Sequence, residues 1–371
     1  MITRQLTTAI QRVIHKKKAI IVLGPRQVGK TTLIKSLLGS DNYLFLDGDD
    51  KTIAKQLSEA NTYIIKQIIG SHTKVFVDEA QKIDNIGNAL KIITDQLPDV
   101  ELYISGSSSL EMNQATQEPL TGRKFEFELF PISWKEFENH VGYLNAESQL
   151  EHRLIYGMYP DVLTDSEFEV KTLKNLTQSY LYQDILALTG IRKPEILDRL
   201  LMALALQIGN EVSYNELAQL LQIDKVTVMK YIDLLEQSFI IFTLPSFNRN
   251  LRNEIKNNRK IYFYDNGIRN AIINNFNALD ARNDKGALWE NFLISERRKQ
   301  NAYTQHYCRT YFWRTQIQQE IDYLEESNGK IQAFEFKWNN TKTFRFPAAF
   351  AKTYDSVPTL IDKNNFREFI G

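Results

Sequence analysis

Gly24-Pro25-Arg26-Gln27-Val28-Gly29-Lys30-Thr31 is the stretch that decides the fold, and the apolar run Ala19–Leu23 precedes it. Such a run, rich in β-branched residues, is typical of a strand buried on both faces of a parallel sheet. Gly-x4-Gly-Lys-Thr between a strand and a helix is a phosphate-binding pattern, because its glycines let backbone N–H groups close around phosphate oxygens. The sequence therefore predicts a nucleotide-binding α/β domain.

Within this loop, we expect Lys30 to bring its charge to the β and γ phosphates and Thr31 to bind Mg²⁺ through its hydroxyl. The helix that begins here would point its positive end at the anion. The alternative is a glycine turn that binds no nucleotide. We expect ATP and Mg²⁺ as cofactors, with the nucleotide bound by Gly24, Pro25, Arg26, Gln27, Val28, Gly29, Lys30, Thr31 and Thr32.

A second apolar strand, Lys74–Asp78, ends in the acids Asp78 and Glu79, which is the Walker B pattern. We expect Asp78 to hold magnesium, and Glu79 to orient or deprotonate the water that attacks the γ phosphate. The alternative is a solvated strand end followed by a helix cap. Ser107 and Ser108 follow a further strand, where one of them could sense the γ phosphate; an ordinary Ser-Gly turn is the alternative.

These motifs resemble one family in their order along the chain: the loop, Phe76-Val77-Asp78-Glu79-Ala80-Gln81, Leu120-Thr121-Gly122-Arg123, and Phe130–Phe137. That family is the bacterial and archaeal AAA+-like ATPases with a C-terminal DUF4143 domain. The resemblance extends to the segments 156–161, 260–267 and 287–291. It implies that Arg123 is a γ-phosphate arginine, in its own subunit or as an arginine finger of a homo-oligomer. A surface arginine is the alternative. No Asn-Lys-x-Asp guanine-reading segment follows Asp78 and Glu79, which favours ATP over GTP.

The middle of the chain has helical spacing from Leu173 to Leu206. Two short helices follow, Ser213–Leu221 and Lys225–Glu236, and then the strand Phe239–Leu244. This order predicts a helix-turn-helix within a winged helix. The second helix carries only Lys225 and Lys230 as bases, against several acids, and the segment 249–260 is more basic. One interpretation of this basic segment is DNA contact, and the alternatives are a solvated wing or a protein-docking surface.

The C-terminal third contains two expected strands that carry acids. Glu320-Ile321-Asp322 and Glu335-Phe336-Lys337 each alternate, so their charged residues share a strand face. If the strands pair, Asp322, Glu335 and Lys337 converge, and a helical acid, Glu290, could complete a metal shell. Salt-bridged ladders on half-buried strands are the alternative.

The DUF4143 resemblance implies a PD-(D/E)xK nuclease fold here, carried by Glu290, Arg314-Thr315, Glu320-Ile321-Asp322 and Glu335-Phe336-Lys337. It implies that Asp322, Glu335 and Lys337 are catalytic and that Glu290, Asp322 and Glu335 bind metal. Gln319 stands where a glycine is expected, which puts the hairpin geometry in question. His306 and Cys308 have no second His/Cys pair, so we expect no zinc site.

The length of 371 residues favours two or three domains, and we expect three. They are an AAA+-type P-loop domain with a parallel sheet (1–165), a helical connector with winged helix (166–260), and a restriction-endonuclease-like α/β domain (261–371). Forty-five basic and 45 acidic residues give no net field. No apolar run is long enough for a bilayer. One cysteine and no leader-like N-terminus predict a reducing, cytoplasmic setting.

The sequence leaves two functions open. The first is an ATPase whose nucleotide state controls a DNA-handling C-terminal domain, which could be a metal-dependent nuclease. The second is a nucleotide-controlled protein- or DNA-binding switch whose nuclease-like domain is only a scaffold. A GTPase or small-molecule kinase is disfavoured.

Overall fold

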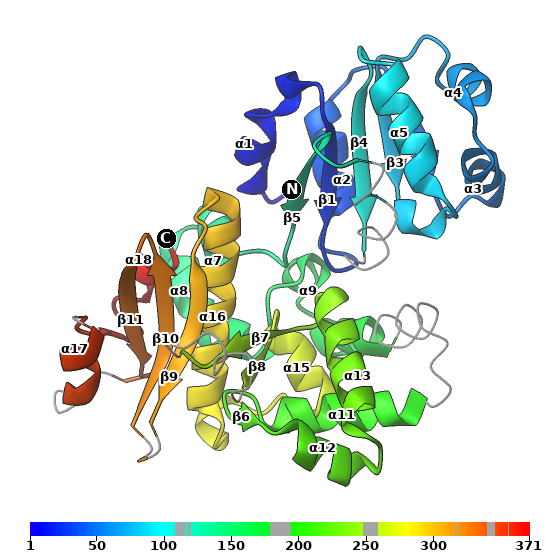
Figure 1. Ribbon diagram of the computed structural model, residues 1–371. Helices are drawn as coiled ribbons and strands as arrows, with labels where there is room; N and C mark the ends of the chain where they lie inside the picture. Colours follow the sequence, from blue (N-terminus) through cyan, green and yellow to red (C-terminus); the bar gives the residue numbers. More distant parts are fainter. Residues whose placement is uncertain are drawn as a thin grey trace. The chain divides into compact units, whose positions relative to one another are not determined.

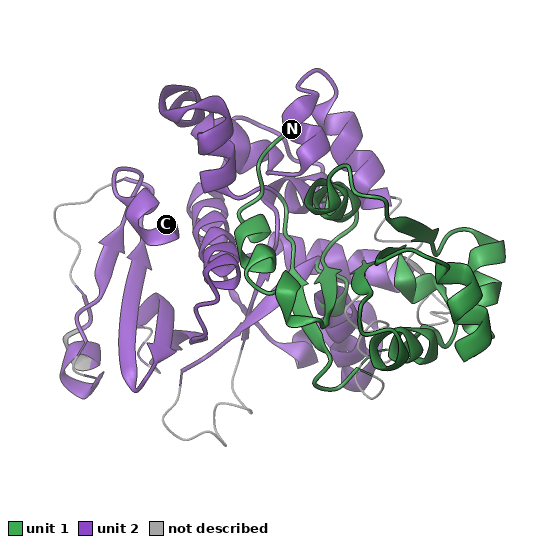
Figure 2. Ribbon diagram, turned by 90° about the horizontal axis from the view of Figure 1, so that it is seen from above, with its two compact units in different colours: residues 1–131, 237–239 green, residues 132–236, 240–371 purple. Residues whose placement is uncertain are grey.

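The computed structural model describes the chain except residues 108–115, 117–119, 179–193, 248–258, 316, 318, 340–345 and 355. The described residues form two compact units (Figure 2): unit 1 contains residues 1–131 with 237–239, and unit 2 contains residues 132–236 with 240–371. Among these residues, no helix is both long and apolar enough to cross a membrane.

Unit 1 is a five-stranded sheet with helices around it (Figure 1). The strand order is β2-β3-β4-β1-β5, and every neighbouring pair is parallel, as the run of apolar strands predicts. Strand β1 is buried along its whole length. The strands are β1 (Ala19–Leu23), β2 (Leu44–Asp47), β3 (Lys74–Asp78), β4 (Glu101–Gly106) and β5 (Lys124–Glu128).

Two helices of unit 1, α3 and α4, begin at polar caps. Asp50 and Asn61 each accept two backbone N–H groups at a helix start. The helices are α1 (Leu6–Gln11), η1 (Ile14–Lys16), α2 (Lys30–Leu38), α3 (Lys51–Ser58), α4 (Thr62–Ile69), η2 (Ala80–Lys82) and α5 (Ile86–Gln96).

Unit 2 contains two sheets. The smaller is antiparallel, in the order β6-β8-β7, and the larger has the order β12-β11-β10-β9 with only its β11–β12 pair parallel. The strands are β6 (Glu211–Val212), β7 (Ile241–Pro245), β8 (Arg259–Phe263), β9 (Arg309–Arg314), β10 (Glu320–Ser327), β11 (Lys330–Phe336) and β12 (Thr359–Ile361).

The helices of unit 2 surround these sheets, and the long α16 runs beside both of them in Figure 1. They are α7 (Trp134–Val141), α8 (Tyr143–Tyr156), α9 (Pro160–Thr164), α11 (Pro194–Leu206), α12 (Tyr214–Leu221), α13 (Lys225–Gln237), α15 (Asn266–Ile272), η3 (Leu279–Ala281), α16 (Lys285–Thr304), α17 (Ala348–Tyr354) and α18 (Phe366–Ile370). The helical spacing expected over 173–206 falls partly on residues 179–193, outside the described residues.

The two sheets of unit 2 are linked directly. Ser246 forms a parallel bridge with Phe312, and Arg314 of β9 donates to Glu211 of β6 at 2.9 Å. The boundary expected between residues 260 and 261 falls inside β8, which pairs with β7 along its whole length. The division into three domains stays a prediction.

Two of the segments that carry the family resemblance pack against each other. A Cβ on Gly157 would lie 2.0 Å from an Asp265 oxygen, and one on Gly267 would lie 2.2 Å from the Tyr156 carbonyl oxygen. Asp265 accepts the N–H groups of Met158 and Ile268. These glycines are therefore required by close approach of the two segments.

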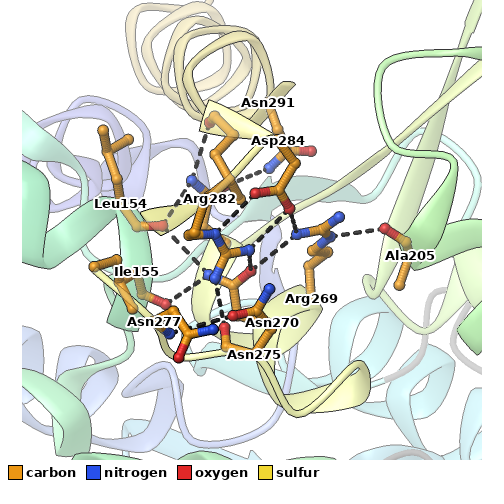
Figure 3. Close-up of polar contacts among 12 residues, drawn as sticks. Leu154, Ile155, Ala205, Arg269, Asn270, Asn275, Asn277, Arg282, Asp284 and Asn291 are labelled. Atoms are coloured by element: carbon orange, nitrogen blue, oxygen red, sulfur yellow. Dashed lines mark hydrogen bonds and ion pairs between the residues drawn. The ribbon is translucent and has the colours of Figure 1, made fainter. Parts of the chain in front are cut away.

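A buried polar network continues from α15 (Figure 3). Asp284 pairs with Arg269 and Arg282, and Arg269 also donates to the carbonyl oxygen of Ala205 in α11 at 2.7 Å. Asn270 accepts from both arginines. This network joins α11, α15 and the start of α16.

Candidate functional site

The phosphate-binding loop of unit 1 runs from the carboxyl end of β1 to the first residue of α2. Gly24 has no room for a side chain, because a Cβ would lie 2.0 Å from the carbonyl oxygen of Leu129. Gly29 has a φ of +92°, in the region that favours glycine. Both glycines of the pattern are thus explained by backbone geometry.

Lys30 is held inside this loop. Its Nζ donates to the carbonyl oxygens of Gly24 and Pro25, at 2.9 and 2.8 Å, and the residue is only 4% exposed. The ammonium therefore lies among the atoms that would surround a phosphate. Of the other predicted loop residues, Val28 is buried, Arg26 and Thr31 are half-buried, and Gln27 and Thr32 are exposed.

The structure brings the loop threonine and the Walker B aspartate together, although 47 residues separate them. The Thr31 hydroxyl lies 2.9 and 3.1 Å from the two carboxylate oxygens of Asp78. Ser105, on β4 between β1 and β3, also donates to Asp78. A hydroxyl and a carboxylate in contact are the oxygen ligands that Mg²⁺ prefers, so these residues fit the ion.

Glu79 is positioned by side chains from two elements. Gln81 Nε2 donates to Glu79 Oε2 at 2.6 Å and to Ser107 Oγ at 2.8 Å, and Ser107 Oγ lies 3.3 Å from the same Glu79 oxygen. Glu79 itself has a φ of +49°, a strained conformation typical of functional sites. Ser108 lies outside the described residues.

Arg123 lies at the opposite end of the sheet from the loop. It immediately precedes β5, whose first residue Lys124 pairs with Ala19, the first residue of β1. The loop follows the other end of β1, on the order of 15 Å away for a five-residue strand. Arg123 pairs instead with Asp95 at 2.5 Å. The structure therefore does not place Arg123 beside the loop of its own chain, and its role as a γ-phosphate arginine stays a prediction.

The sequence reasoning missed three residues of this site. Gln81 and Ser105 hold the Walker B acids, as described above. Arg4 is buried and donates to the carbonyl oxygens of Val28, in the loop, and Phe130, both at 2.6 Å. The Asp78-Glu79-Ala80-Gln81 order carried a signal for Gln81, but nothing near Arg4 in the sequence indicates its partners.

In unit 2, the predicted acids converge. Asp322 on β10 and Glu335 on β11 are buried, Glu290 comes from α16, and Lys337 directly follows β11. Asp322 accepts the N–H of Phe336 at 2.8 Å, and Lys337 donates to Glu335 at 2.7 Å. One oxygen of Glu335, Oε2, is buried with no hydrogen-bond partner among the described residues.

The electrostatics of this cluster follow from its burial. Burial and the nearby charges of Glu290 and Glu335 raise the pKa of Asp322 well above its usual range. Burial also raises the pKa of Glu335, against the hydrogen bond from Lys337. Buried carboxylates with an unpartnered oxygen are an environment that a cation would stabilise.

Glu290 is engaged differently from the other two predicted metal ligands. Its Oε1 accepts from Lys260 Nζ at 3.1 Å and from Tyr262 Oη at 2.5 Å. Both residues were missed, although Lys260 and Tyr262 alternate along one strand and so share a face of β8. Glu335 also pairs with a lysine, Lys337, but its Oε2 is buried without a partner among the described residues, so Asp322 and Glu335 fit a divalent cation. Glu290 is paired with the buried Lys260 instead.

The hairpin around Gln319 forms without a glycine. Glu320 pairs with Arg314 across β10 and β9, and Gln319 is not among the described residues with positive φ. A register shift between Ile321 and Leu324 interrupts the pairing beside Asp322. Such bulges commonly redirect side chains near functional sites.

One other group has metal-ligating chemistry. Over the described part of the chain, only His306, Cys308 and Glu325 place three such ligand atoms within 4.8 Å of one another. Glu325, however, accepts from Arg297 through both oxygens and from Asn301. A bound metal ion would face the Arg297 charge, so this arrangement is better explained as a buried ion pair.

Helix α13, which the sequence predicts as a recognition helix, presents few charges. Lys225 and Lys230 are exposed, but so are Val226, at 74%, and Met229. The more basic segment beyond it lies, for residues 249–258, outside the described residues. DNA contact and protein docking both remain compatible with this surface.

Three segments of this chain match models of known domain families. Residues 16–138 match the AAA domain family, residues 147–279 match a domain of unknown function (DUF8612), and residues 285–366 match a domain of unknown function (DUF4143). An uncharacterized protein of Mycobacterium tuberculosis is 26% identical over 344 residues, which is 91% of this chain and 74% of the relative. One of Haemophilus influenzae is 25% identical over 279 residues, 68% of each chain.

A Walker-type ATPase of Pyrococcus abyssi has a similar structure. Its TM-score is 0.53 at 14% sequence identity, with 74% of this chain and 96% of that chain covered. At this identity the likeness supports the fold alone.

Proposed function

This chain combines an AAA domain of the P-loop ATPase type with a C-terminal DUF4143 domain, and we propose that it binds and hydrolyses ATP with Mg²⁺. The contact between Thr31 and Asp78 is the observation that carries this proposal, because it joins the two halves of a magnesium–phosphate site.

Each residue of the site has a role in this proposal. Lys30 exchanges its contacts with the loop carbonyl oxygens for the β and γ phosphate oxygens. Thr31 and Asp78 would hold the magnesium ion, which supplies charge neutralisation to the phosphates when bound. Glu79, fixed by Gln81 and Ser107, orients the attacking water.

The Lys30→Ala variant tests nucleotide binding. Loss of the buried ammonium is expected to weaken ATP binding at least about tenfold, because the variant removes a charge-assisted contact to the phosphates. Calorimetric titration with ATP and Mg²⁺ measures this. Lys35→Ala, which removes an exposed lysine of the same helix, is the matched control. Equal ATP affinity in Lys30→Ala and wild type would contradict the proposal.

We further propose that nucleotide state controls a DNA-handling function of unit 2. The order α11, β6, α12, α13, β7 and β8 with the sheet order β6-β8-β7 supports the winged-helix prediction. That sheet is linked to the sheet of Asp322 through Glu211 and Arg314. DNA bound at the first could thus be presented to the second, in a reducing, cytoplasmic setting.

Metal-dependent phosphodiester cleavage is favoured by one specific observation, the partnerless oxygen of Glu335 beside the buried Asp322. These two carboxylates would hold a divalent cation, which supplies Lewis-acid polarisation of the phosphate when bound. Lys337, held by Glu335, would orient or activate the water.

Cleavage of plasmid and single-stranded DNA with Mg²⁺ or Mn²⁺, with and without ATP, tests this function. The Asp322→Ala variant is expected to lose cutting, whereas Glu326→Ala, which removes a less buried acid of the same strand, retains it. An effect of ATP on the rate would show that the two units are coupled. No cutting by wild type, with ATP hydrolysis intact, would favour the non-cleaving binding switch instead.

Arg123 has a role in the proposed function only if copies of the chain assemble into an oligomer. Because it lies at the end of the sheet opposite the loop, it could serve ATP hydrolysis only as an arginine finger for a neighbouring copy of the chain. A homo-oligomer with the site completed in trans is therefore proposed. Full activity of a strictly monomeric chain would contradict it.

A further inference from the structure

Lys260 is the most deeply buried cation of the carboxylate cluster. It lies on β8 and is 2% exposed, and its Nζ donates to Glu290 of α16 and pairs with Glu320 of β10. A buried charge is strongly unfavourable unless it is paired. Burial alone would lower the pKa of Lys260, but the charges of Glu290, Asp322 and Glu320 outweigh it, so that the net pKa is raised. The lysine is therefore a fixed positive charge.

Glu290 is already paired with a cation of the protein. Two donors, Lys260 Nζ and Tyr262 Oη, occupy its Oε1. A divalent ion bound by Glu290 would also lie close to the Lys260 ammonium, and the two like charges would repel each other.

Glu290 is bound differently from Asp322 and Glu335, although its charge acts on both of them. Asp322 and Glu335 lie on paired strands, whereas Glu290 is turned to the smaller sheet by its bonds to β8.

We infer that the Lys260 ammonium, which pairs with Glu290 and Glu320, occupies the place that a metal ion would take at the Glu290 carboxylate. Lys260 thereby confines divalent-ion binding to Asp322 and Glu335. Lys260 is thus a positioning residue of the cluster. The inference rests on the proposed role of Asp322 and Glu335 in metal binding. It is tested by ion binding and not by DNA cleavage, so a failure of the inference can be distinguished from a failure of the proposed nuclease function.

A Lys260→Met variant can remove the charge with little change in volume. The Lys260 Nζ lies 5.4 Å from the centre of the Phe312 ring, and a methionine sulfur makes favourable contacts with an aromatic ring at such distances. The variant removes the cation paired with Glu290, whereas Glu320 keeps its pairing with Arg314. It therefore creates a vacant carboxylate site beside Asp322.

Mn²⁺ binding to the full-length, nucleotide-free chain, measured by calorimetry, tests the inference. The parent and all variants carry Asp78→Asn, so that the ATP site does not contribute a carboxylate ligand for Mn²⁺. Only the Mn²⁺ binding that is lost on adding Asp322→Asn is assigned to the carboxylate cluster. Lys260→Met is expected to bind Mn²⁺ at least about tenfold more tightly than the parent, because a like charge is lost. Adding Glu290→Gln should cancel this gain, and Lys330→Met, at an exposed lysine, should show none.

Glu290→Gln alone provides an independent measurement should Lys260→Met fail to fold. It is expected to leave Mn²⁺ affinity within about twofold of the parent, since Glu290 is not a ligand while Lys260 is present. A loss of affinity as large as that of Asp322→Asn would overturn the inference. So would a folded Lys260→Met that binds Mn²⁺ no more tightly than the parent.

Discussion

The Glu79→Gln variant is expected to bind ATP as tightly as the wild-type chain and to hydrolyse it at least about 100-fold more slowly. A positioned general base typically contributes 10²- to 10⁴-fold to a rate, and glutamine cannot accept the proton of the attacking water. The amide is similar in size and keeps an oxygen that can accept from Gln81. The ATP affinity should therefore stay unchanged while the hydrolysis rate falls.

Phosphate release at saturating ATP, together with calorimetric ATP affinity, measures both effects on one preparation. Glu59→Gln is the matched control, because Glu59 is an exposed glutamate of the same unit at the end of α3. Turnover of Glu79→Gln equal to that of wild type would remove Glu79 from the role of base. Loss of ATP binding would instead assign it to the binding of nucleotide or metal.

The Asp284→Asn variant is expected to lower the free energy of unfolding of unit 2 by about 3 kcal/mol at pH 7, as for other buried ion pairs that lose one partner. Asp284 is the carboxylate shared by Arg269 and Arg282 in the network of Figure 3, and Arg282 is 9% exposed. The amide leaves two largely buried guanidinium groups without a counter-charge. All four tryptophans lie in unit 2, so the fluorescence change on denaturation reports this unit.

The pH dependence of this effect has a definite sign. Burial raises the pKa of Asp284, but the hydrogen bonds and charges of Arg282 and Arg269 outweigh it and lower the pKa to about 2. A carboxyl whose pKa is lower in the folded state stabilises the fold above its ordinary pKa, and this contribution is lost as the pH falls through the folded-state pKa. The difference between wild type and Asp284→Asn should therefore shrink between about pH 4 and about pH 2.

Asp280→Asn is the control for this measurement. Its side chain is 91% exposed and pairs only with Lys285 among the contacts of the described residues. Surface pairs of this kind contribute little. A pH-independent difference for Asp284→Asn would contradict the ion-pair explanation.

Local patterns in the sequence were sufficient for the parallel sheet of unit 1 and for naming most residues of its candidate nucleotide site. Buried parallel strands have to be apolar along their whole length, and a phosphate loop requires glycines at set spacings, so both appear as contiguous patterns. The alternation of residues on β10 and β11 was likewise enough to bring Asp322, Glu335 and Lys337 together in the prediction.

Only the tertiary structure decided which end of the sheet carries Arg123, and which partners Arg4, Glu290 and Lys260 have. Arg4 contacts a carbonyl group 126 residues away, and Lys260 joins two sheets and a helix. Such contacts depend on the order of strands and on packing between elements, which leave no periodic trace in a single sequence. Sequence motifs indicate which chemical groups belong to these sites, whereas strand order and packing determine which of those groups are in contact.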